Sequence, residues 1–179
     1  MNRESELTLS VFTENRVGLL GRVAATFTRR SLNIESLTVS ESELPGIHRF
    51  TIVVRTSRET ARKLAAQIER HVDVLKAFVH TDGEVVQREV ALYKVDPVRL
   101  SEAFESLIVG HGARVLERQA DFVVVEHVGS DADTSALLEA LRPYGVLEFV
   151  RSGRVALTRP MRPLAEFLDA LERDAGNAR

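Results

Sequence analysis

The sequence predicts an α+β protein in which the element order β-α-β-β-α-β occurs twice. Stretches of alternating apolar and polar residues, typical of half-buried strands, are separated by stretches whose apolar residues have helical spacing. The pattern of the first half then recurs in the second half, and 179 residues are enough for two small domains. Because each element has one apolar face, each unit should form a four-stranded sheet with two helices on one side, a ferredoxin-like arrangement.

The first unit begins with a strand in which Leu7, Leu9 and Val11 alternate with polar residues. A helix should begin near Val17 or Gly18. Its apolar positions follow helical spacing, namely Leu19, Leu20, Val23, Ala24 and Phe27.

The rest of the first unit reads as a hairpin, a helix and a strand. Asn33 opens the second strand, and the turn at 43–46 connects it to the third. Ser57 is the expected N-cap of the second helix. A fourth strand covers about 72–80, and Asp82-Gly83 ends the unit.

The second unit repeats this order. The expected elements are a strand containing Val90 and Leu92, a helix from Leu100 to Ile108, strands at about 113–117 and 121–128, a helix carrying Leu137, Leu138 and Leu141, and an extended segment at 147–157 interrupted at Ser152-Gly153. Asp131 or Asp133 is the expected cap of the second helix.

Composition excludes several classes of function. A formal net charge of -2 provides no basic field for nucleic acid. The absence of cysteine removes disulfides, thiolate nucleophiles and cysteine-ligated metals, and it fits a reducing compartment. The first residues are charged, and no apolar run approaches the roughly 20 residues of a membrane span. We therefore expect a cytoplasmic protein.

The sequence also argues against catalysis. It contains no phosphate-binding loop, nucleophile elbow or zinc-protease motif. The five histidines share no metal-ligand spacing, and no pair of carboxylates stands out for acid–base work. We expect no catalytic residue and no metal site.

The turn from Glu14 to Leu19 carries the most specific signal. A helix N-terminus presents unpaired N–H groups and the positive end of the helix dipole, which suit a carboxylate. Gly18 lets an anion approach the backbone, and the side chains of Asn15 and Asn33 offer donors and acceptors to a small zwitterion. The alternative is that Asn15 only caps the helix and Asn33 only occupies a turn.

Residues 13–20, followed by Arg22-Val23, Phe27 and 33–39, resemble the ACT domain of the acetolactate synthase small subunit, which is also called the acetohydroxyacid synthase regulatory subunit. Residues 72–75 resemble the fourth strand of that domain, and residues 150–159 resemble the closing segment of the family. The resemblance is specific in the first unit and looser in the second, where residues 109–128 depart from the pattern.

The resemblance implies a function. Such proteins are homodimers whose ACT domains pair side by side and bind a branched-chain amino acid, usually valine, at the dimer interface. They have no catalytic site or cofactor of their own. They activate a large catalytic subunit, in which thiamine diphosphate, Mg and FAD are expected, and they confer feedback inhibition on it. Carried over to this sequence, the effector-binding residues are Asn15, Val17, Gly18, Leu19, Asn33 and Ile34, with Val17 and Leu19 contributing backbone and Ile34 lining the side-chain pocket.

The expected domains are an ACT domain at 1–83, a ferredoxin-like regulatory domain at 84–160 and an amphipathic helical tail at 161–179. The tail either covers its own domain or contacts the catalytic subunit. Two other functions stay open from the residues alone. One is a stand-alone amino-acid sensor with another partner, and the other is a small enzyme on the same scaffold.

Overall fold

The computed structural model describes residues 4–159, 165–166 and 169. The described residues form two compact units, one comprising residues 4–86 together with those described after residue 155, and the other comprising Gln87–Val155. The domain ranges expected from the sequence stay predictions. The expected C-terminal helix lies almost wholly outside the described residues.

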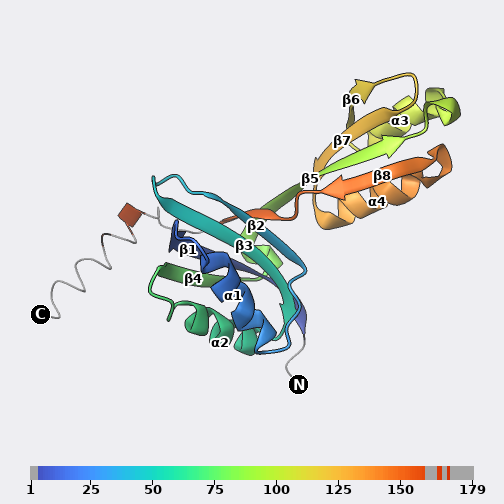
Figure 1. The fold of residues 1–179 in the computed structure, drawn as a ribbon. Helices are drawn as coiled ribbons and strands as arrows, with labels where there is room; N and C mark the ends of the chain where they lie inside the picture. Colours follow the sequence, from blue (N-terminus) through green and yellow to red (C-terminus); the bar gives the residue numbers. More distant parts are fainter. Residues whose placement is uncertain (1–3, 160–164, 167–168, 170–179) are drawn as a thin grey trace, which may run out of the picture. The chain divides into compact units, whose positions relative to one another are not determined.

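The first unit has the predicted order β-α-β-β-α-β. Its elements are β1 (Ser5–Glu14), α1 (Leu19–Thr28), β2 (Ser36–Glu41), β3 (Ile47–Thr56), α2 (Arg58–Ile68) and β4 (Val74–His80). The strands form an antiparallel sheet in the order β2-β3-β1-β4. Figure 1 shows α1 and α2 on the same face of this sheet.

The core of the first unit lies between the sheet and the two helices. Leu9 and Ile52 are paired on β1 and β3 and are fully buried. The predicted stripe of α1 is confirmed at Leu19, Val23 and Phe27, which pack into this core. Leu20 is 46% exposed, because it follows Leu19 by one position and therefore points away from the sheet.

The second strand begins later than predicted. Asn33 does not open it, because β2 starts at Ser36. The chain first turns at Ser31, whose φ is 52°, and the Leu32 N–H donates to the Phe27 carbonyl at 3.1 Å. These contacts close the end of α1 and leave Asn33 in the connection between helix and strand.

The second unit repeats the order. The short 3-10 helix η1 (Asp82–Glu84) precedes β5 (Val85–Val95), whose first two residues belong to the first unit. The elements that follow are η2 (Pro97–Arg99), α3 (Glu102–Gly110), β6 (Arg114–Arg118), β7 (Val123–Gly129), α4 (Asp131–Leu141), η3 (Arg142–Tyr144) and β8 (Val146–Arg151). The last strand, β9 (Val155–Thr158), begins at the final residue of the second unit and continues into the first. The sheet order is β6-β7-β5-β8, and β9 pairs with β5. Tyr93, Phe104, Val125, Leu137 and Leu141 are buried in its core.

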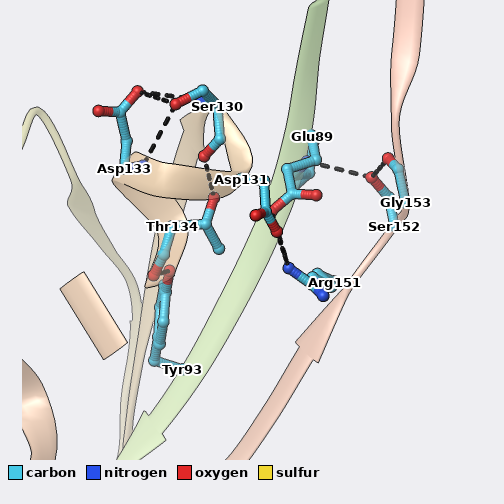
Figure 2. Close-up of polar contacts among 10 residues, drawn as sticks. Glu89, Tyr93, Ser130, Asp131, Asp133, Thr134, Arg151, Ser152 and Gly153 are labelled. Carbon is cyan, nitrogen blue, oxygen red and sulfur yellow. Dashed lines mark hydrogen bonds and ion pairs between the residues drawn. The ribbon is translucent and has the colours of Figure 1, made fainter. Parts of the chain in front are cut away.

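The cap of α4 differs from the prediction. Ser130, and not Asp131 or Asp133, is the N-cap residue, and its hydroxyl accepts from the Asp133 N–H at 3.2 Å. The Asp133 carboxylate in turn accepts from the Ser130 N–H and hydroxyl, as Figure 2 shows. The two side chains form a reciprocal capping box.

Across the described part of the chain, no helix is long and apolar enough to cross a membrane.

Candidate functional site

The predicted turn connects β1 to α1 and leaves the start of the helix open. Gly18 is the N-cap residue of α1, with a left-handed backbone conformation (φ 82°, ψ −6°), and no side chain caps the helix. The alternative in which Asn15 caps this helix is therefore wrong. The Leu20 and Gly21 N–H groups, at the second and third positions of α1, are left to water or a ligand, because the first bond within the helix runs from the Arg22 N–H to the Gly18 carbonyl. The φ value favours glycine at position 18.

The turn is anchored through its backbone. The Asn15 N–H donates to the Gly46 carbonyl at 3.1 Å, and the Leu19 N–H donates to the Arg16 carbonyl at 3.3 Å. Asn15, Val17 and Gly18 are exposed, whereas the Leu19 side chain is buried in the core. Leu19 therefore offers a ligand no side-chain contact, and its N–H is already used within the turn.

Asn33 and Ile34 lie at the other end of the sheet. Asn33 is exposed, with its side-chain amide 3.4 Å from a carboxylate oxygen of Glu35. Ile34 is half-buried and packs against the core. Ser36, where β2 begins, pairs with Val53 of β3, whereas Glu14 at the end of β1 pairs with Ile47.

These two pairings separate the predicted site residues within one chain. From Ile47 to Val53 the strand advances six residues, or roughly 20 Å at the rise of an extended strand. The structure thus brings together Asn15, Val17, Gly18 and Leu19, but it does not bring Asn33 and Ile34 to them in the same chain. A site made of all six requires two copies.

Asp73 supports the turn, and sequence analysis missed it. Its carbonyl accepts from the Glu14 N–H at 2.9 Å, and its carboxylate forms an ion pair with Arg22 on α1. One residue therefore holds both the end of β1 and the first turns of α1. Only the pairing of β1 with β4 reveals this role, since Arg22 and Asp73 are far apart in sequence.

The similarity to known proteins covers both units. Residues 9–76 match the family model described as "AHAS small subunit-like ACT domain", and residues 88–160 match "Small subunit of acetolactate synthase". The acetolactate synthase small subunit of Bacillus subtilis is 38% identical over 156 residues, which cover 86% of this chain and 89% of that protein. This chain belongs to the acetolactate synthase small subunit family.

Two other members of the family support this assignment. The probable acetolactate synthase small subunit of Methanothermobacter thermautotrophicus is 35% identical over 87% of this chain and 94% of that protein. The crystal structure of the acetolactate synthase small subunit from Thermotoga maritima superposes with a TM-score of 0.81 at 29% identity, covering 88% of this chain and 99% of that chain. The first unit is thus an ACT domain, and the predicted ferredoxin-like fold is confirmed.

The closing segment that resembles the small-subunit family has a structural role in the second unit. Arg151 forms ion pairs with Asp131 and, at 3.6 Å, with Glu89, which is buried (Figure 2). The Ser152 N–H donates to the Val90 carbonyl at 2.9 Å, and the Val90 N–H donates to the Ser152 hydroxyl at 3.1 Å. These contacts fix the segment to β5.

The described residues offer little for metal chemistry. Over residues 4–159, 165–166 and 169, no group of three or more His, Asp or Glu side chains could hold a metal ion.

The assignment of the six effector-binding residues stays a prediction.

Proposed function

We propose that this chain is a non-catalytic regulatory subunit of acetolactate synthase that acts in the cytoplasm. It activates the large catalytic subunit, which holds thiamine diphosphate, Mg and FAD, and it confers feedback inhibition by valine in branched-chain amino-acid biosynthesis. The observation that carries the proposal is the exposed, uncapped start of α1 at Gly18 in a chain of this family.

The separation of the two halves of the predicted site supports a homodimer. In this proposal, α1 of one copy binds the effector carboxylate with its free N–H groups, and Asn33 of the other copy contributes its side-chain amide. Ile34 is half-buried beside Asn33, where it can contact the branched side chain. Valine then binds only when two ACT domains are paired.

Regulation follows from differential binding. If valine binds one arrangement of the paired ACT domains better than another, it shifts the population toward that arrangement. An arrangement that holds the catalytic subunit in a less active state then produces inhibition, with a coupling free energy of about 1–3 kcal/mol. Activation in the absence of valine uses the other arrangement.

Gly18→Asp tests the proposal. The new carboxylate lies where the effector carboxylate binds, so we expect the reconstituted enzyme to lose valine inhibition while most of its activation is retained. Two variants serve as controls. Gly18→Asn adds a neutral side chain that tolerates the left-handed conformation, and Gly83→Asp adds the same charge at an exposed glycine elsewhere.

The measurements are calorimetric titration of the purified chain with valine, leucine and isoleucine, and inhibition of the reconstituted enzyme by each. The titration also determines effector preference. Unchanged valine inhibition in Gly18→Asp would contradict the proposed site. Failure of the chain to bind or activate a thiamine-diphosphate-dependent acetolactate synthase would contradict the proposed function.

A further inference from the structure

The second unit contains an open pocket that the proposed function does not use. Its cavity volume is about 370 Å³, within the roughly 300–1,000 Å³ of typical small-molecule sites. The end of β7, the first turns of α4, the glycine-rich chain after α3 and Arg88 of β5 line it. Three of its lining residues have nitrogen-containing side chains, namely Arg88, His111 and His127.

His127 has an unsatisfied ring nitrogen. The residue is only 5% exposed, and its Nδ1 is buried without a hydrogen-bond partner. Buried polar atoms are rarely left unpaired, and an exception calls for an explanation such as a bound ion or water. In the tautomer whose hydrogen is on Nδ1, an acceptor supplied by a ligand would complete the hydrogen bonding of this imidazole.

Gly129 makes room for this ring. A Cβ atom added at Gly129 would lie 2.3 Å from Cε1 of His127 and 3.1 Å from Cβ of Asp133. The ring therefore occupies the space that any other residue at position 129 would need. The glycine at position 129 thus allows His127 to lie at the wall of the pocket.

His111 adds a second ring to the lining. Its Nδ1 lies 2.9 Å from the Leu107 carbonyl, which can only accept, so Nδ1 carries the hydrogen. Nε2 is the ring atom that is left for another partner. His111 is the C-cap residue of α3.

The single acidic residue of the lining already has its donors. The Asp133 carboxylate accepts from the hydroxyl of Ser130 at 2.7 Å and from its N–H at 3.1 Å. These hydrogen bonds hold the pKa of Asp133 below its ordinary value, so the group is ionised. Arg88 is exposed, and its Nη1 donates to the neighbouring Gln87 carbonyl, which leaves most of its five N–H groups available. The lining thus has more donors than acceptors.

We propose that this pocket binds a small oxyanion, a carboxylate or a phosphate, with Arg88 and His127 as donors and His111 at its rim. Arginine matches such groups because its planar guanidinium can donate two parallel hydrogen bonds to them. The anion balances the excess of donors and completes the hydrogen bonding of His127. This site is separate from the predicted valine site in the ACT domain.

The test is NMR titration of the full ¹⁵N-labelled chain with inorganic phosphate, with acetate and with chloride at constant ionic strength. We expect saturable shifts of the His111, His127 and Gly129 signals with phosphate or acetate but not with chloride. The tighter of the two identifies the class of oxyanion. Arg88→Gln should weaken binding roughly tenfold or more, as expected for a lost hydrogen bond to a charged group.

Arg62→Gln is the matched control, because Arg62 is an exposed arginine on α2 in the other unit. It should leave the titration unchanged. The proposal is overturned if the shifts do not saturate, if chloride produces the same shifts, or if Arg88→Gln binds as tightly as the unmodified chain. The last two results would indicate an adventitious ion only. None of these readouts depends on valine or on a catalytic subunit, so the proposed function is tested independently.

Discussion

At the scale of single residues, Asp73 connects the fold to the predicted valine site. It holds the end of β1 through its carbonyl and the first turns of α1 through its carboxylate. Asp73→Asn keeps the shape and the backbone contact but removes the charge that pairs with Arg22. We expect the free energy of unfolding to fall by at most about 1 kcal/mol, as for other partly exposed ion pairs.

The same substitution should affect valine binding more than stability, because a loosened α1 no longer presents its N–H groups in one geometry. We expect a several-fold loss of valine affinity in calorimetric titration. Urea unfolding measures the stability of the same variant, and Asp121→Asn, at an exposed turn of the second unit, is the control. Unchanged affinity would show that the ion pair does not position the turn.

His80 gives the ACT domain a dependence on pH. It is 8% exposed, its Nε2 has no hydrogen-bond partner, and its ring stacks on Phe78. Burial lowers the pKa of His80, which Arg49 and Arg58 lower further and Glu84 partly restores. The unfolded chain therefore binds a proton at this residue more readily than the folded chain does.

The stability contributed by neutral His80 should be lost as the pH falls below about 6.5, the ordinary value for histidine. One proton limits the slope to about 1.4 kcal/mol per pH unit. Urea unfolding between pH 5 and pH 8 should show a shallower acid loss for His80→Gln than for the unmodified chain. Equal slopes would show that other groups cause the acid loss.

At the scale of elements, the capping box of α4 predicts that Ser130 contributes to stability. The N-cap residue of α3 provides a control variant. Ser130→Ala removes a side-chain acceptor from the Asp133 N–H and should reduce the free energy of unfolding by about 1 kcal/mol. Ser101 is the N-cap residue of α3 but makes no side-chain cap hydrogen bond. Ser101→Ala should therefore change urea unfolding little, and similar losses in the two variants would contradict this account.

The elements themselves could be predicted because periodicity is a local property. The stripe of α1 is confirmed at Leu19, Val23 and Phe27, and Ser57 is confirmed as the N-cap of α2. The expected cap of α4 is wrong, and so is the alternative in which Asn15 caps α1, for different reasons. At α4 the spacing Ser130 to Asp133 already fits a capping box, whereas at α1 the chain folds so that Gly18 occupies the cap position. The contact of Asp73 with Arg22 depends on strand pairing, which no local pattern contains.

At the scale of the whole molecule, strand register determines which predicted site residues can meet. Asn15 lies beside the Ile47 end of β3, and Asn33 lies before the residue that pairs with Val53. The sequence placed both asparagines in one site without showing that they lie at opposite ends of one sheet. Two copies related by a two-fold axis can bring the turn of one to Asn33 of the other, with each edge strand β2 close to the axis.

Val39 tests this arrangement, because it lies on the edge strand β2 and is 40% exposed. A charge on an edge strand opposes pairing with a second copy, so Val39→Lys should shift the chain from dimer toward monomer in analytical ultracentrifugation. Valine affinity should fall with it by roughly tenfold or more, equivalent to at least about 1.4 kcal/mol. Val98→Lys, at an exposed valine of the second unit, is the matched control and should stay dimeric. A monomeric Val39→Lys chain that binds valine as tightly as the dimer would show that the site lies within one chain and that Asn33 is not part of it.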